Sequence, residues 1–205
     1  MRPVVYHLVG PPGSGKRTVG LHLAELTGAV LLDNHLFRDA VYKPYGADGI
    51  RPVPPELQAL GTQVWALGLQ AARLAPPDVS QIFTAYLPAL DTALASWQRI
   101  RDLAKDRNAH YVPVWLTCES KELTRRLTMP ERAQRAKLRD PERLRKLMAE
   151  NGLLPPPPDA LLLDTTALSP ADAARSIACH VDGQGASSTA LHAARHRAKQ
   201  SRPRK

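Results

Sequence analysis

The sequence predicts an α/β fold in which a parallel sheet is covered by helices on both faces. Two observations favour it: short apolar runs alternate with longer helical patterns, and a glycine-rich loop joins the first run to the first helical pattern. Continuous apolar runs are typical of strands buried on both faces, and strands separated by helices pair in parallel. The predicted strands are 4–9, 29–32, 79–84, 111–117 and 160–163.

The helical patterns lie between and after these runs. The last of them begins with Ser169 and Pro170, an N-cap residue followed by proline at the first helical position. Pro113 conflicts with a central place for the fourth strand, because proline removes a ladder donor. The predicted helices are 16–26, 56–74, 89–106, 119–128, 141–149 and 169–181.

Length and charge bound the domain organisation. A chain of 205 residues is typical of one domain, and it contains no apolar run near the roughly 20 residues that a membrane span needs. We therefore expect a cytoplasmic protein without a membrane partner. The net charge of +9 is concentrated in residues 121–146 and 182–205, which attract phosphorylated ligands or nucleic acid.

The C-terminal segment differs in composition from the rest. Residues 1–182 are predicted to form the domain, whereas 183–205 are rich in Gly, Ser and Ala and then in Arg, Lys and His, without periodicity. Such a composition predicts disorder. The tail is interpreted as a solubilising segment, with weak contact to nucleic acid as the alternative.

A phosphate-binding loop follows the first predicted strand. Its pattern is G-x-x-x-x-G-K, and a helical pattern begins directly after it. The glycines let backbone N–H groups approach a phosphate, and the helix adds its positive end. Lys16 is expected to reach the β- and γ-phosphates. The motif reads Gly10-Pro11-Pro12-Gly13-Ser14-Gly15-Lys16-Arg17-Thr18.

Asp33 is the predicted catalytic carboxylate. It follows the second strand, at the carboxyl edge of the sheet where ligands bind in folds of this class. There it would orient or deprotonate an acceptor hydroxyl. The alternative is that Asp33 or Asn34 caps a short helix through Tyr42. His35 is either a second acid or base at the same edge or a packing residue.

The loop resembles that of the nucleoside monophosphate kinase superfamily, which includes shikimate kinase, gluconate kinase and chloramphenicol phosphotransferase. The resemblance implies a three-layer P-loop NTPase fold, with a five-stranded parallel sheet of order 2-3-1-4-5 and a helical lid. It also implies ATP and Mg²⁺ as cofactors. It covers residues 3–181 and continues through Leu31-Leu32-Asp33-Asn34-His35, Glu122-Leu123-Thr124-Arg125-Arg126-Leu127, Leu163-Asp164-Thr165-Thr166 and Ser169-Pro170.

The chain departs from this pattern at two places. Arg17 stands where shikimate kinase-like members have a metal-binding hydroxyl, although Thr18 matches the Gly-Lys-Gly-Thr order of adenylate kinases. We therefore expect Mg²⁺ to be held by phosphates, water, Thr18 and Asp33. The third strand ends in Phe83-Thr84-Ala85-Tyr86, without a Walker B aspartate or the substrate motifs of shikimate and adenylate kinases. The acceptor is thus expected to be neither shikimate nor AMP.

Residues 125–150 are predicted to form the lid. Its basic residues would neutralise the transferring phosphoryl group, and the resemblance places Arg126 against the nucleotide. These basic residues are Arg126, Arg132, Arg135, Lys137 and Arg139. The alternative is a solvated helix with pairs such as Glu131 with Arg135. Residues 34–74 are predicted to bind the acceptor, and 43–55 to form an ordered loop over it. The candidates there are Arg38, Tyr42, Lys43, Tyr45 and Arg51.

The leading hypothesis is an ATP-dependent phosphotransferase whose partner is a small molecule with a hydroxyl, acting as a monomer or homodimer. The alternatives are a kinase of nucleotides or RNA ends and a non-catalytic ATP-binding regulator. The predicted catalytic residues are Lys16, Asp33, Arg132 and Arg135. The predicted nucleotide-binding residues are Gly10, Gly13, Ser14, Gly15, Lys16, Arg17, Thr18 and Arg126, and the predicted metal ligands are Thr18 and Asp33.

Overall fold

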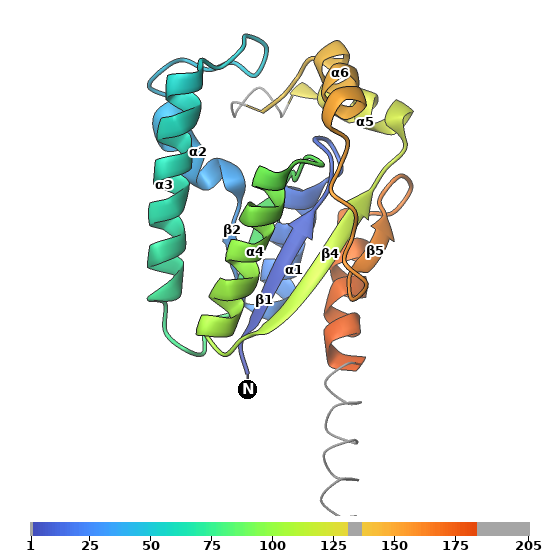
Figure 1. Ribbon diagram of the computed structural model, residues 1–205. Helices are drawn as coiled ribbons and strands as arrows, with labels where there is room; N and C mark the ends of the chain where they lie inside the picture. Colours follow the sequence, from blue (N-terminus) through green and yellow to red (C-terminus); the bar gives the residue numbers. More distant parts are fainter. Residues whose placement is uncertain (1, 131–136, 184–205) are drawn as a thin grey trace, which may run out of the picture.

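The computed structural model describes residues 2–130 and 137–183. Five strands form one parallel sheet in the order β2-β3-β1-β4-β5, which confirms the predicted fold class and strand order (Figure 1). The strands are β1 (Val4–Val9), β2 (Val30–Leu32), β3 (Gln81–Ala85), β4 (His110–Thr117) and β5 (Leu161–Asp164).

The helices follow the predicted order, with one more after β2. They are α1 (Lys16–Thr27), α2 (Asn34–Tyr42), α3 (Pro55–Arg73), α4 (Asp91–Asp106), α5 (Ser120–Leu127) and α6 (Pro141–Asn151), and residues 170–183 are also helical. None of the helices in the described ranges is long and apolar enough to cross a membrane.

The helix ends follow local sequence signals. The Asp140 carboxylate accepts hydrogen bonds from the N–H groups of Glu142 and Arg143 at the start of α6, where Pro141 is the first helical residue. The Ser169 hydroxyl likewise accepts from the N–H of Asp172 before the last helix. α1 ends at Gly28, whose φ of 71° is the left-handed conformation that glycine adopts without strain.

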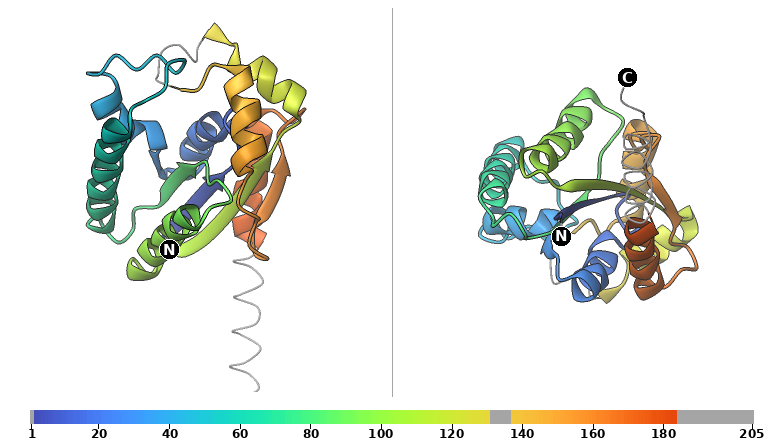
Figure 2. Two further views of the ribbon diagram at one scale, coloured as in Figure 1. Left: turned by 45° about the horizontal axis from the view of Figure 1, so that its top comes forward. Right: turned by 90° about the horizontal axis from the view of Figure 1, so that it is seen from below.

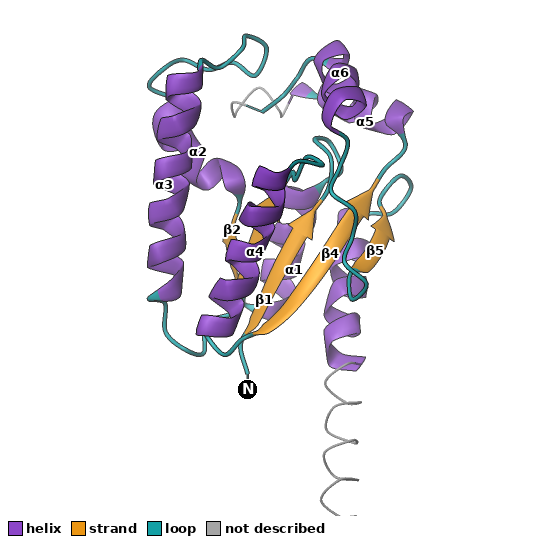
Figure 3. Ribbon diagram, viewed as in Figure 1, coloured by secondary structure: helices purple, strands orange, loops and turns teal. Residues whose placement is uncertain are grey.

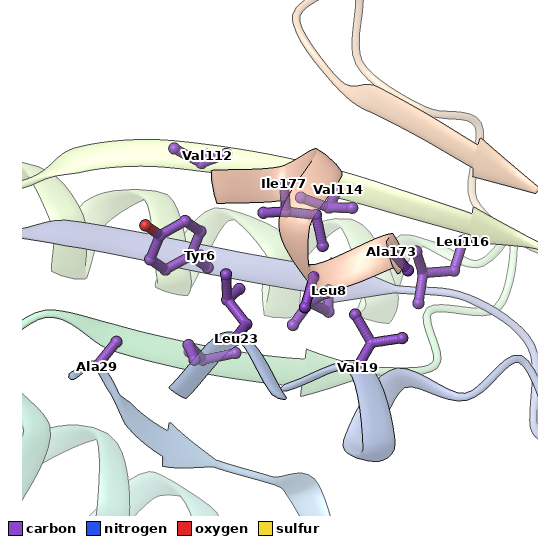
Figure 4. Close-up of a cluster of buried hydrophobic side chains, with 12 residues drawn as sticks. Tyr6, Leu8, Val19, Leu23, Ala29, Val112, Val114, Leu116, Ala173 and Ile177 are labelled. Carbon is purple, nitrogen blue, oxygen red and sulfur yellow. The ribbon is translucent and has the colours of Figure 1, made fainter. Parts of the chain in front are cut away.

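Two helical layers cover the sheet, α1 and helix 170–183 on one face and α3 and α4 on the other (Figures 2 and 3). On the first face Leu23 of α1 and Ile177 of the last helix pack against Leu8 and Val114 (Figure 4). All four side chains are fully buried. Burial of this apolar surface on both faces fixes the strands, and therefore the loops at their carboxyl ends.

Pro113 is accommodated in the central strand β4 because the neighbouring strand β5 is short. It pairs with His7 of β1, but the pairing of β4 with β5 begins only at Val114. On the β5 side no strand therefore requires an N–H from Pro113. The third strand begins later than the predicted 79–84, because the N–H of Val79 donates to the Pro76 carbonyl in a turn.

Candidate active site

The predicted phosphate loop joins β1 to α1 at the carboxyl edge of the sheet. Gly13 and Gly15 have φ angles of 96° and 84°, a left-handed conformation that other residues adopt only with strain. Gly10 lies so close to β4 that a β-carbon there would be 2.6 Å from the Leu116 carbonyl oxygen. Two of the motif glycines are thus required by backbone conformation and the third by a close approach.

The Lys16 ammonium lies inside the curve of the loop. Its Nζ donates to the carbonyl oxygens of Gly10 at 2.7 Å and Pro11 at 2.8 Å. Ser14 is buried beneath the loop, and its hydroxyl has no hydrogen-bond partner within the described part of the chain. The first N–H groups of α1 have no partners within the helix, so the loop presents donors and positive charge to an anion.

Asp33 lies at the N-cap position of α2, but its side chain does not cap the helix. Its Oδ1 accepts a hydrogen bond from the Thr84 hydroxyl at 2.6 Å, and its Oδ2 lies 3.3 Å from Nε of Arg17. The Thr84 hydroxyl oxygen in turn accepts from the N–H of Asn34 at 3.2 Å. Asp33 is 6% exposed, so side chains from two other segments, β3 and α1, hold a buried carboxylate in one orientation.

His35 lies one turn before Asp39 on α2, with its Nδ1 3.4 Å from Asp39 Oδ1. Burial lowers the pKa of His35, and the positive charge of Lys137 lowers it further, whereas Asp33 and Asp39 act in the opposite direction. Burial therefore favours the neutral imidazole. The neutral ring can accept a proton or a hydrogen bond at the same edge of the sheet.

Arg126 connects α5 to the phosphate loop. Its guanidinium donates to Glu122 Oε1 at 2.7 Å and to the Thr165 carbonyl at 2.6 Å. Hydrogen bonds from Arg125 and Arg126 lower the pKa of Glu122 to about 2, so this carboxylate stays ionised. The Thr165 hydroxyl donates to the Ser14 carbonyl at 3.1 Å. Arg126 is thus held beside the loop by a chain of contacts.

These side chains line a single cavity of about 520 Å³ above the carboxyl ends of β1 and β3. It brings together the predicted residues of the loop, the β2 edge and the lid; Gly10 and Ser14 lie outside its lining. Arg132 and Arg135, predicted as catalytic, fall outside the described residues. The predicted residues that line the cavity are Gly13, Gly15, Lys16, Arg17, Thr18, Asp33, His35 and Arg126.

The cavity also contains residues that sequence reasoning did not assign to the site. They are Thr84 in β3 and Tyr86 directly after it; Lys137, which was predicted among the basic lid residues, also lines the cavity. The sequence could have indicated these β3 residues only by their position in the fold. Because β3 is the neighbour of β1, side chains at the carboxyl end of β3 face the same cavity as the phosphate loop. Two of the predicted acceptor-binding residues, Arg38 and Tyr42, do not line the cavity. Instead they contact each other, because the Arg38 guanidinium donates to the Tyr42 hydroxyl at 3.3 Å.

The other acceptor candidates also lie outside the lining. Arg51 pairs with Asp48, and its Nε donates to Asp48 Oδ2 at 2.9 Å. Lys43 lies 3.8 Å from Asp39, and the Tyr45 side chain is exposed. Residues 43–54 nevertheless contact the segment before α6, because the N–H of Arg139 donates to the carbonyl of residue 49 at 3.2 Å.

The predicted metal ligands differ in how well they fit Mg²⁺. The described residues contain no group of three or more His, Cys, Asp or Glu placed to hold a metal ion. Thr18 is exposed and lines the cavity, which suits a hydroxyl ligand. Asp33 suits the ion less well than the sequence indicates, because the Arg17 guanidinium already lies against its Oδ2.

The sequence matches no family model, and no curated protein is significantly similar to it. Solved structures do match. One is a candidate kinase from Chloroflexus aurantiacus, with a TM-score of 0.66 and 18% identity over 89% of this chain and 98% of that chain. Another is shikimate kinase from Acinetobacter baumannii in complex with shikimate, with a TM-score of 0.57 and 21% identity over 89% and 94% of the two chains.

A third match is the APS kinase of Mycobacterium tuberculosis in complex with AMPPNP and APS. Its TM-score is 0.56, with 19% identity over 88% of this chain and 98% of that chain. Identities this low are evidence of shared architecture. Together with the sheet order and the glycine loop, they show that the chain has the three-layer fold of the P-loop kinases.

Proposed function

We propose that this protein is a P-loop kinase that transfers the γ-phosphoryl group of ATP to a hydroxyl of a small molecule. The observation that carries the proposal is the common cavity. Lys16 of the loop, Asp33 of the β2 edge and Arg126 of α5 come from three separate segments and line the same space. Phosphoryl transfer depends on this combination of phosphate ligands, a carboxylate and cations, because catalysis is mostly positioning and charge stabilisation.

The loop would bind the triphosphate. Its backbone N–H groups and the positive end of α1 converge on the cavity, as anion sites at helix N-termini do. The Lys16 ammonium, now held by two loop carbonyls, would exchange them for phosphate oxygens. Arg126 and Lys137 on the lid side would stabilise the charge that develops on the phosphoryl group.

Asp33 would act on the acceptor. Its carboxylate, fixed by Thr84, would accept a hydrogen bond from the acceptor hydroxyl and orient the oxygen toward the γ-phosphorus. As the new O–P bond forms, the bond from phosphorus to the leaving diphosphate oxygen breaks, and the hydroxyl proton passes to the carboxylate. His35, whose ring lines the same cavity, is a second group able to accept this proton.

Mg²⁺ bound with the nucleotide would supply further neutralisation of phosphate charge. The Thr18 hydroxyl is the side chain best placed to hold it, with phosphate oxygens and water completing its octahedral shell. The cavity volume of about 520 Å³ has to hold the phosphate chain and the acceptor together. The acceptor is therefore a small molecule, of the size class that ligand pockets enclose.

The direct test is incubation of the protein with Mg-ATP and a library of metabolites, antibiotics and RNA oligonucleotides with free 5′-hydroxyls, followed by mass spectrometry. We expect one phosphorylated small molecule and its loss in Lys16→Ala, which removes the ammonium that would bind the phosphates. Circular dichroism would establish that the variant folds. Full activity in this variant would contradict the proposal. Phosphorylated RNA alone, or ATP binding without any product, would favour the respective alternative.

A further inference from the structure

Arg17 stands where the loop of shikimate kinase-like members has a hydroxyl, and the structure gives it a partner. Its Nε lies 3.3 Å from Asp33 Oδ2, joining the first turn of α1 to the N-cap position of α2. Its side chain is 29% exposed and that of Asp33 9%, so water screens the pair only in part. Both residues line the cavity assigned to the triphosphate.

An unpaired carboxylate in this cavity would oppose the binding of a triphosphate. Like charges repel strongly where little water separates them. Asp33 cannot turn away from the cavity, because the Thr84 hydroxyl holds its Oδ1 at 2.6 Å. A positive group beside Asp33 is therefore needed before the phosphates enter. The loop pattern of shikimate kinase-like members has a metal-binding hydroxyl at this position instead of a positively charged side chain.

We propose that Arg17 is a built-in counter-ion for Asp33, which lets the cavity bind a nucleoside triphosphate without a divalent cation. The inference rests on the proposed nucleotide site. A fixed guanidinium supplies the charge that would otherwise arrive with Mg²⁺. The ion would still assist the transfer step, but nucleotide binding would no longer depend on it.

Two other roles for Arg17 agree less well with the geometry. A solvated helix residue would face water, whereas the Arg17 Nε and Asp33 Oδ2 atoms are both buried. A simple phosphate ligand would not need Asp33, yet the two groups are held against each other by separate helices. A double-mutant cycle separates these roles, because it measures whether the effect of one residue depends on the other.

The test is calorimetric titration with ATP, once in excess EDTA and once in Mg²⁺, for the wild type, Arg17→Gln, Asp33→Asn and the double variant. We expect the wild-type Kd values in the two buffers to agree within about threefold. Arg17→Gln should bind at least about tenfold more weakly in EDTA but change little in Mg²⁺. The double variant should regain wild-type affinity in EDTA, because the carboxylate that Arg17 neutralises is gone.

Arg73→Gln is the matched control. Arg73 pairs with Asp106 at 3.1 Å, away from the cavity lining, so its loss should change neither Kd. Thermal unfolding without nucleotide checks that each variant folds, and the wild-type comparison of the two buffers needs no variant at all. Wild-type binding that requires Mg²⁺ would overturn the inference alone. The inference would also be overturned if Arg17→Gln lost the same ATP affinity in both buffers, or if the double variant bound ATP in EDTA no more tightly than Arg17→Gln. No ATP binding in either buffer would instead contradict the proposed function, and the inference with it.

Discussion

The carbonyl oxygen of Lys137 lies in the space that a β-carbon on Gly49 would occupy. Lys137 lines the cavity, whereas Gly49 lies outside its lining, in the segment between α2 and α3. The N–H of Arg139 donates to the Gly49 carbonyl at 3.2 Å, and the Arg143 guanidinium donates to the Ile50 carbonyl at 3.2 Å. These contacts join the segment between α2 and α3 to residues 137–143, which include Lys137 of the cavity lining.

Gly49→Ala is expected to separate the segment between α2 and α3 from residues 137–143. The methyl group would overlap the Lys137 carbonyl, and the φ of 77° would be strained in alanine. The two hydrogen bonds between these segments should be lost with the contact. We expect faster amide hydrogen exchange at 137–143 and a lower kcat/KM for phosphotransfer, measured by exchange mass spectrometry and steady-state kinetics.

Gly46→Ala is the control that separates backbone strain from steric overlap with a neighbouring carbonyl. Gly46 has a φ of 74°, but nothing lies within 4 Å of a β-carbon built there. It should therefore show only the conformational cost, about 1–2 kcal/mol of unfolding free energy. Exchange at 137–143 should stay at the wild-type rate. Equal exchange rates in the two variants would show that the Gly49 contact does not hold residues 137–143 in place.

Arg126→Ala is expected to weaken ATP binding at least about tenfold, because a charged hydrogen bond contributes about 1.5–3 kcal/mol. Arg125→Ala is its matched control. Both guanidiniums bind Glu122, but only that of Arg126 lines the cavity. Calorimetric Kd values for ATP should therefore differ between the two variants. A similar loss of affinity in both variants would mean that Arg126 acts through its contact with Glu122 and does not bind the nucleotide.

Asp33→Asn is expected to lower kcat by about 10²-fold or more, the usual effect of losing a general base, without weakening ATP binding. Thr84→Val removes the hydroxyl that donates to Oδ1 and accepts from the Asn34 N–H but leaves the carboxylate itself, so the loss of kcat should be smaller. Steady-state kinetics with the identified acceptor measures both. If His35→Asn lowered kcat more than Asp33→Asn did, the histidine would be the proton acceptor.

The sheet and its loop were predictable because their signals are local. The apolar runs and the glycine spacing predict the parallel sheet, the strand β1 and the start of α1, and the structure has all three. Strand order needed the resemblance, since apolar runs alone do not say which strands are neighbours. The extent of β4 depended on how far β5 reaches beside Pro113, which is a tertiary fact.

The site was predictable only in part. The position of Asp33 after β2 indicated that it shares an edge with Lys16, and both line the cavity. The two partners of its carboxylate were not predictable. Arg17 precedes Asp33 by 16 positions and Thr84 follows it by 51, and no helix or strand periodicity connects residues so far apart in the sequence. Arg38 was expected at the acceptor and instead binds Tyr42, one helical turn away.

The buried imidazole of His7 is expected to make the stability of the fold depend on pH. His7 lies in the middle of β1, 1% exposed, with Nδ1 3.0 Å from the Tyr111 hydroxyl, and burial lowers its pKa to about 3. The unfolded chain has the ordinary value near 6.5. Above pH 6.5 the ring is neutral in both states. Below it the unfolded state binds a proton that the folded state excludes, so the free energy of unfolding falls as the pH drops from 6.5 toward 3.

Urea unfolding at pH 7.5 and 5.5 isolates this effect when the wild type is compared with His7→Gln. The wild type should lose about 1.3 kcal/mol more between the two pH values than the variant, which has no imidazole at this position. The comparison cancels every other group that titrates in this interval, His35 included, and the low pKa of Glu122 keeps that carboxylate ionised throughout. The variant's own stability does not enter, because only the change with pH is compared. An equal loss in both proteins would show that the ring of His7 is protonated in the folded state, and therefore that β1 admits water at its centre.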